Sequence, residues 1–195
     1  SDIEVAYRRG TRYVPAVEDL SVGEGSPATP LEKGGVYLIS GGLGGIGLAV
    51  ARWLTETWQA KLSLLRRTEL SSEADGDELL AEGSNQSVVK KIQAVQELRE
   101  LGAEVWAPQA DVADLAEMRV VIDGAIERFG RVDGVFHLAA AVHNALLHTK
   151  ADDQFAGVLR PKVQGAWVLD RVTRVRGLKF MVLFASLAGR EGNVF

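Results

Sequence analysis

A glycine-rich loop is the strongest chemical signal in this sequence. Residues 40–47 read S-G-G-L-G-G-I-G, so Gly42, Gly44 and Gly47 have G-x-G-x-x-G spacing between a predicted strand and a predicted helix. Glycine permits a tight turn here, lets backbone N–H groups approach a pyrophosphate, and lets the helix pack closely on the strand. This setting favours dinucleotide binding, with a flexible turn or another nucleoside ligand such as S-adenosylmethionine as alternatives.

Basic residues stand where a dinucleotide site would contact the adenosine ribose. An NAD site expects an acidic residue about 20 positions after the loop, but the residue at this place is Arg67, preceded by Arg66. Two guanidinium groups suit a 2′-phosphate, which favours NADPH over NADH, unless they only belong to a solvated loop. Asp111 follows a later apolar run and is expected to bond the adenine amino group; its rival use is capping the helix that starts near Asp114.

Alternating apolar strands and amphipathic helices position these residues. Strands are expected at 36–39, 62–65, 105–110, 132–138 and 180–185. Helices are expected over 46–54, 88–98, 115–129 and 155–169, the last kinked or begun at Pro161. The predicted core-facing positions are Ile46, Ala49, Val50, Trp53 and Leu54 in the first helix, and Phe155, Val158, Leu159, Val163, Trp167 and Leu169 in the last. The pattern predicts an α/β fold, a doubly wound parallel sheet with helices on both faces.

The chain divides into three parts by composition. Residues 1–20 hold a predicted exposed strand or small hairpin around Arg9-Gly10 and look like the tail of another domain or a strand docked on one; the resemblance described below implies the C-terminal strand segment of a preceding structural subdomain. Residues 21–34 have linker composition, and 35–195 form the nucleotide-binding part. The acidic stretch 69–82 is expected to be a solvated insertion. Because no strand or helix is predicted after Ser186, the sheet is expected to be incomplete at the C-terminus.

Composition excludes several classes of function. In 195 residues, 22 Lys and Arg face 26 Asp and Glu, a net charge of −4 that argues against a nucleic-acid partner. No apolar run is long enough for a membrane span. Without cysteine there is no disulfide or thiolate chemistry, which leaves a cytoplasmic location as the default. The histidines do not have metal-ligand spacing, so no metal is expected.

The motifs, taken in order, resemble the short-chain dehydrogenase/reductase superfamily, which has a Rossmann fold, and within it the ketoreductase domain of modular polyketide synthases. The matching pieces are G-V-Y-L-I-S-G-G-L-G-G-I-G, L-L-R-R, A-D-V-A-D, G-V-F-H-L-A-A, L-R-P-K-V-Q-G-A and L-F-A-S-L-A-G, which together span residues 35–192. The resemblance implies hydride transfer from NADPH to the β-keto group of an acyl chain on an acyl carrier protein, beside neighbouring synthase domains.

The resemblance also implies roles for individual residues. Cofactor contacts fall on Gly41, Gly42, Leu43, Gly44, Gly45, Ile46, Gly47, Arg66, Arg67, Asp111, Val112, Ala139 and Ala140. Ser186 would hydrogen-bond the substrate carbonyl, and Lys162 would orient the proton relay and lower the pKa of the donor. On the residues alone, a solvated helix lysine is the favoured interpretation of Lys162, and a turn cap is the favoured interpretation of Ser186.

Two departures from the family pattern bear on activity. The family's tyrosine proton donor would fall beyond Phe195, and Tyr7, Tyr13 and Tyr37 cannot replace it, so the chain as given is expected to be inactive alone. Residues 142–144, V-H-N, stand where members of one stereochemical type resemble Leu-Asp-Asp. His143 is expected to be a surface residue, and His137 a packed core residue.

Two rival functions stay open. A noncatalytic reductase-like domain would only order its neighbours in a synthase. A methyltransferase of the same fold would carry an acidic residue after the second strand, and Arg66 and Arg67 speak against it.

Overall fold

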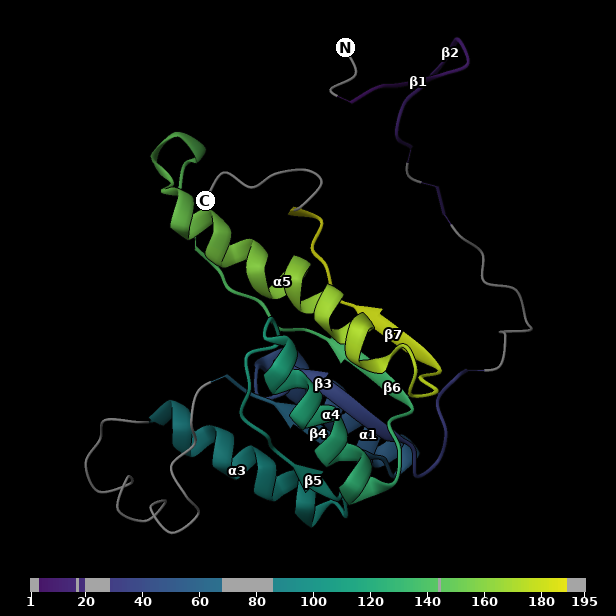
Figure 1. Ribbon diagram of the computed structural model, residues 1–195, viewed down its shortest axis with the longest axis vertical. Helices are drawn as coiled ribbons and strands as arrows, with labels where there is room; N and C mark the ends of the chain where they lie inside the picture. The colour runs from purple at the N-terminus through teal and green to yellow at the C-terminus, as the bar shows by residue number, and fades with distance from the viewer. Residues whose placement is uncertain (1–3, 17, 20–28, 68–85, 144, 189–195) are drawn as a thin grey trace.

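The computed structural model describes residues 4–16, 18–19, 29–67, 86–143 and 145–188 (Figure 1). The acidic stretch 69–82 lies outside the described residues, as does most of the predicted linker. Near the amino end, β1 (Ala6–Arg8) and β2 (Thr11–Tyr13) form an antiparallel hairpin. Its turn residues Arg9 and Gly10 have φ angles of 51° and 80°, the pair of left-handed conformations that a tight two-residue hairpin turn requires. The hairpin expected around Arg9-Gly10 is confirmed.

Five parallel strands form the central sheet. They are β3 (Val36–Ser40), β4 (Lys61–Leu65), β5 (Val105–Trp106), β6 (Gly134–His137) and β7 (Phe180–Leu183). Their order is β5-β4-β3-β6-β7, so the chain first builds outward from β3 on one side and then returns to its other side (Figure 1). At this reversal, between the carboxyl ends of β3 and β6, a parallel sheet opens a crevice for a ligand.

Helices cover both faces of the sheet, which confirms the predicted doubly wound fold. One face carries α1 (Gly45–Trp58) and α3 (Gln86–Glu100), and the other carries α4 (Leu115–Phe129) and α5 (Asp152–Thr173) (Figure 1). Successive side chains of β3 enter opposite cores: Tyr37 and Ile39 pack under α1 and α3, and Leu38 packs under α4 and α5. Within the described residues, no helix is both long and apolar enough to cross a membrane.

Strand β5, the third strand of the central sheet along the chain, is shorter than predicted. The expectation of a strand over 105–110 is wrong after Trp106, because Pro108 has no N–H with which to continue the ladder. Pairing with the neighbouring strand resumes only as an isolated bridge between Arg66 and Gln109. The fourth and fifth strands also end before the predicted bounds, at His137 and Leu183.

The buried faces of two helices differ from the prediction. In α1, Ile46 and Trp53 are 65% and 46% exposed, and the buried residues are Gly47, Ala51, Leu54 and Thr55. In α5, the stripe of Phe155, Leu159, Val163 and Trp167 is exposed, and the buried residues are Gly165, Val168, Leu169, Val172 and Thr173. Small residues allow each helix to approach the sheet closely, so the most apolar stripe is not the buried one. Since α5 begins at Asp152 and includes Pro161, the alternative that it begins at this proline is wrong.

Asp133 joins the amino ends of three strands. Its side chain is 4% exposed, and Oδ2 accepts hydrogen bonds from the Val36 N–H at 2.9 Å and Arg131 Nε at 2.7 Å. Oδ1 lies 3.1 Å from the Lys179 ammonium. Burial alone would raise the pKa of this carboxyl, but the bonds from Arg131, Val36 and Lys179 outweigh burial and lower the pKa below its ordinary value. The carboxylate thereby fixes the start of β3, the strand that leads into the glycine loop.

Replacing Asp133 by asparagine is expected to lower the free energy of unfolding at pH 7 by about 1–3 kcal/mol, the cost of disrupting a buried hydrogen-bonded group. Because the pKa is lower in the folded state, the carboxylate stabilises fully above its unfolded pKa of about 3.9. This stabilisation is lost as the pH falls through the folded pKa. Urea unfolding at pH 7 and pH 3 should show a difference between wild type and Asp133→Asn that shrinks in acid. A difference of equal size at both pH values would contradict the role of the charge, and Glu127→Gln, at an exposed carboxylate of α4, is the control.

Candidate functional site

The glycine loop lies between β3 and α1, at the carboxyl edge of the sheet. Gly41 has a φ of 71°, and the Gly44 N–H donates to the Gly41 carbonyl at 3.0 Å, which closes the turn. Gly44 caps α1 without a side-chain hydrogen bond, and there is no acidic residue in the first turn. The amino end of α1 therefore presents backbone N–H groups and the positive end of the helix dipole to a ligand anion.

Close backbone contacts explain why glycine is needed in this loop. A Cβ at Gly47 would lie 2.4 Å from the Gly41 carbonyl oxygen and 2.8 Å from Gly42 Cα. A Cβ at Gly42 would lie 2.9 Å from the Ile39 carbonyl oxygen, and one at Gly41 would lie 2.9 Å from Ala139 N. At Gly41, Gly42 and Gly47 the backbone is thus packed against the end of β3, the start of α1 and the segment after β6, with no room for a side chain.

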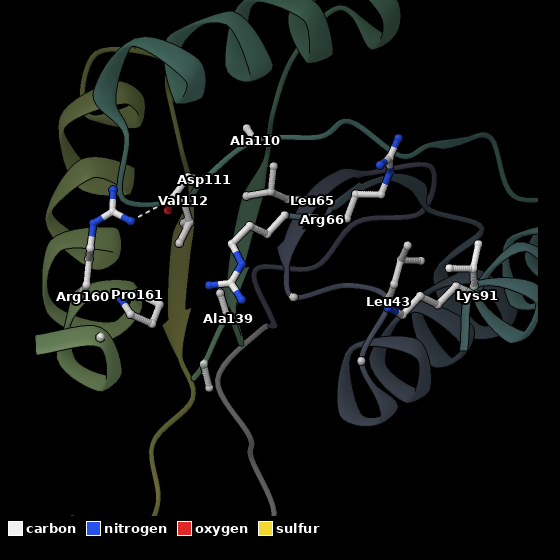
Figure 2. Close-up of a pocket in the computed structure, with 16 residues that line it drawn as sticks. Leu43, Leu65, Arg66, Lys91, Ala110, Asp111, Val112, Ala139, Arg160 and Pro161 are labelled. Carbon is white, nitrogen blue, oxygen red and sulfur yellow. Dashed lines mark hydrogen bonds and ion pairs between the residues drawn. The ribbon is translucent and has the colours of Figure 1, made fainter. Parts of the chain in front are cut away.

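A first cavity of about 320 Å³ lies beside this loop (Figure 2). It gathers predicted cofactor residues from across the sequence: Gly41, Leu43, Gly44, Arg66, Arg67, Asp111, Val112, Ala139 and Ala140. Asp111 and Arg160 lie on one side of the cavity, and Leu43 and Lys91 lie on the opposite side (Figure 2). Lys91 of α3 and Arg160 of α5 are cations that the sequence reasoning missed: Lys91 belongs to no motif, and in the motif L-R-P-K-V-Q-G-A only Lys162 was assigned a role, not Arg160.

The two predicted clamp arginines differ in their surroundings. Arg66 follows β4 and is held by the neighbouring segment: its Nε donates to the Ala107 carbonyl at 3.1 Å, and its main-chain N–H donates to the Pro108 carbonyl at 3.1 Å. Arg67 is exposed, and its main-chain carbonyl accepts from Gln109 Nε2 at 3.2 Å. Both side chains line the cavity, but Arg66 is anchored to the backbone beside it.

Asp111 is oriented by three interactions. Its Oδ1 accepts from the Ala113 N–H at 2.8 Å, and its Oδ2 pairs with Arg160 (Figure 2). Its own N–H donates to Glu117 Oε2 at 2.7 Å. The helix cap is instead Asp114, whose Oδ1 accepts from the first turn of α4. Asp114, and not Asp111, therefore caps α4. The Asp111 carboxylate lines the cavity.

A second cavity of about 680 Å³ holds both predicted catalytic residues. It shares Gly41 and Ala140 with the first cavity, and Lys162, Ser186, Gly45, Ile46 and Gly47 line it. Lys162 Nζ donates to the Phe184 carbonyl at 2.8 Å, which ties α5 to the segment after β7. Burial lowers the pKa of Lys162. The Ser186 hydroxyl is exposed and accepts from the Ala188 N–H at 3.2 Å, so it caps a turn while facing the cavity.

His137 is a packed core residue, as expected. It is 1% exposed, and Nε2 donates to the Pro161 carbonyl at 2.9 Å, because this carbonyl can only accept. Nδ1 then accepts from the Ser40 hydroxyl at 2.6 Å, and Ser40 Oγ accepts from the Ala139 N–H at 3.2 Å. Desolvation by burial lowers the pKa of His137, which keeps the ring neutral. The ring thus links the end of β3 to the turn of α5 that precedes Lys162. His143 is exposed and also lines the second cavity.

Comparisons with known proteins agree on one family. A family model described as the KR domain matches residues 35–194. The chain is 33% identical over 195 residues to the polyketide synthase PksN of Bacillus subtilis, covering 100% of this chain and 3% of that protein. It is 37% identical over 166 residues to the polyketide synthase ThaG of Burkholderia thailandensis, covering 84% and 3%. The chain therefore spans only a small part of these curated relatives.

Solved structures of similar fold include a ketoreductase domain from the bacillaene assembly line. The TM-score is 0.80 at 29% identity, with 98% of this chain and 42% of that chain covered. An NAD⁺-bound xylitol dehydrogenase superposes with a TM-score of 0.66 at 26% identity, covering 83% of this chain and 56% of that one.

Proposed function

The chain belongs to the KR domain family, the ketoreductase domains of polyketide synthases within the short-chain dehydrogenase/reductase superfamily, and from this premise we propose that it serves NADPH-dependent reduction of a β-ketoacyl thioester. The substrate would be carried by an acyl carrier protein, and the product would be the β-hydroxyacyl thioester. The family binds nicotinamide cofactors; the choice of NADPH is our proposal. Its main support is the first cavity, which places Arg66 and Arg67 beside the glycine loop.

The residues present suit this cofactor. The close contacts of Gly47 with Gly41 form a backbone cradle for the diphosphate, at the amino end of α1. Asp111 lines the first cavity, where its carboxylate would bond the adenine amino group. Arg66 and Arg67 line the same cavity and would bind the 2′-phosphate. The second cavity, which continues past Ala140, would take the nicotinamide ribose and the substrate. When bound, the cofactor supplies the hydride that reduces the ketone.

Lys162 and Ser186 are proposed as the catalytic residues of this chain. The Ser186 hydroxyl at the rim of the second cavity would donate a hydrogen bond to the ketone oxygen, where negative charge develops. The Lys162 ammonium, held by the Phe184 carbonyl, would orient the proton relay. Its positive charge lowers the pKa of a neighbouring proton donor, which favours proton release to the substrate.

The relatives indicate the kind of protein in which this reaction would take place. They are polyketide synthases in which a segment like this chain is a small fraction of the length. We therefore propose neighbouring synthase domains and a carrier protein as partners and a cytoplasmic location.

Binding of the two nicotinamide cofactors tests the proposal. The full-length protein, titrated with NADPH and NADH under identical conditions, is expected to bind NADPH at least about tenfold more tightly. One charge-assisted hydrogen bond to the 2′-phosphate contributes about 1.5–3 kcal/mol, which is tenfold or more in affinity. Equal affinities would contradict the proposed binding of the 2′-phosphate by Arg66 and Arg67. Failure to bind either cofactor would favour the rival function, a noncatalytic reductase-like domain.

A further inference from the structure

Lys91 is a cation of the first cavity that lies outside every motif of the sequence. It belongs to α3, whose buried residues Val88, Val95 and Leu98 face the sheet. Lys91 follows Val88 by three positions and precedes Val95 by four, so it lies on this same face of the helix. Its side chain is half-buried and lines the cavity with Val88, on the side of Leu43 in the glycine loop (Figure 2). The preceding residue, Lys90, is exposed and does not line the cavity.

Cations outnumber carboxylates among the described residues that line the cavity. The cations are Arg66, Arg67, Lys91 and Arg160, and the carboxylate is that of Asp111. Arg160 is paired with Asp111, and Arg66 donates through Nε to the Ala107 carbonyl. Among the residues that the structure describes, neither Lys91 nor the Arg67 side chain has an ion-pair partner. Positive charge thus collects where β4 ends and α3 passes, away from the Asp111–Arg160 pair.

Lys91 and the Arg67 side chain line one cavity without an ion-pair partner among the described residues, and an anion that binds between them best explains their presence there. A phosphate monoester carries a charge of about −1.5 to −2 at pH 7 and offers three acceptor oxygens, more than one guanidinium can satisfy. An ammonium acts as a compact point charge with three donors, which complements a planar guanidinium at such a group.

We propose that Lys91 is a specificity-determining residue for the 2′-phosphate, acting from α3 together with Arg67 at the end of β4. Arg66 contributes its charge while it anchors the segment. The phosphate would thereby be held between a loop and a helix far apart in sequence. This inference rests on the proposed binding of NADPH in the first cavity, and it adds a ligand residue that the two-arginine clamp does not contain.

The test separates the 2′-phosphate from the rest of the cofactor. The full-length protein is titrated calorimetrically with adenosine 2′,5′-bisphosphate (2′,5′-ADP) and with 5′-AMP, which differ only in that phosphate. Lys91→Gln is expected to weaken binding of 2′,5′-ADP about tenfold, the effect of one charge-assisted contact, and to leave 5′-AMP affinity unchanged. Lys90→Gln removes the same charge from the adjacent, exposed position and should change neither affinity. Lys91→Arg should recover most of the lost affinity.

The outcomes of these titrations separate the proposed NADPH preference from the proposed role of Lys91. If wild type binds both ligands equally, the proposed NADPH preference fails. If wild type prefers 2′,5′-ADP and Arg67→Gln reduces that preference while Lys91→Gln does not, the proposal for Lys91 is overturned and the clamp consists of arginine alone. Equal losses in Lys91→Gln and Lys90→Gln would also overturn it, because the effect would then be long-range charge rather than contact.

Discussion

Replacing Lys162 by methionine is expected to lower the turnover of a β-ketoacyl thioester by the full-length protein about 10²–10⁴-fold, the usual contribution of a positioned group in proton transfer. Methionine keeps an unbranched apolar stem but removes the ammonium. NADPH affinity is expected to change far less, because the diphosphate cradle and the basic residues of the first cavity are untouched. The measurements are steady-state kinetics and a cofactor titration on the same preparation.

The geometry around Lys162 explains why its effect should fall on chemistry rather than on cofactor binding. Its Nζ donates to the Phe184 carbonyl at 2.8 Å, two residues before Ser186, so the ammonium is held beside the proposed substrate-binding hydroxyl. Lys162 is half-buried, and burial lowers its pKa. A charge partly withdrawn from water acts more strongly on a nearby donor than a fully solvated charge.

The control for this variant is Lys90→Met, which removes a lysine from the exposed surface of α3. Turnover of Lys90→Met should match wild type. Unchanged turnover in Lys162→Met would show that the role carried over from the family is wrong. A parallel loss of turnover and of NADPH affinity would instead assign Lys162 to cofactor binding alone.

Gly47→Ala is expected to disrupt both folding and cofactor binding. The added methyl group would lie 2.4 Å from the Gly41 carbonyl oxygen and 2.8 Å from Gly42 Cα. Because both contacts are with backbone, the clash can be relieved only if α1 shifts away from the loop. Overpacking of this kind costs about 1–3 kcal/mol or more in the free energy of unfolding. NADPH affinity should fall at least about tenfold, since the N–H groups at the amino end of α1 would move from the diphosphate.

Gly45→Ala is the matched control for the effect on stability. It adds the same methyl group two residues earlier, at the first residue of α1, where nothing lies within 4 Å of the new Cβ. Alanine is the better helix former, so the free energy of unfolding should stay the same or rise slightly. Chemical denaturation of the two variants measures the difference. Similar stability of Gly47→Ala and wild type would contradict the close packing of loop and helix.

The glycine loop and the order of strands and helices were predictable because they depend on local rules. Alternation of apolar and helical patterns predicted the parallel sheet. Asp114 and Gly130, which bound α4, carry the capping chemistry that such helix ends require. The predicted cofactor residues around Arg66, Asp111 and Ala139 converge because the carboxyl ends of parallel strands share one edge. Whether each contacts the cofactor stays a prediction.

The buried face of α5 was not predictable in the same way. The strongest apolar stripe of this helix, which includes Phe155 and Trp167, is exposed, and Gly165 faces the core instead. A Cβ at Gly165 would lie 2.9 Å from Val112 Cγ1 and 3.3 Å from His137 Cε1. Hydrophobicity measures the tendency of a side chain to leave water, but it does not measure how closely two elements must approach.

By itself, the sequence determined that a glycine loop joins a strand to a helix in a doubly wound parallel sheet, since backbone conformation and periodicity are local properties. Only the tertiary structure decided which charged side chains share the cavity. Asp111 and Arg160 are 49 residues apart in the chain and form an ion pair, and Lys91 reaches the cavity from a helix outside every motif. Contacts between residues so far apart depend on how the helices pack across the sheet, and no spacing along the chain encodes them directly.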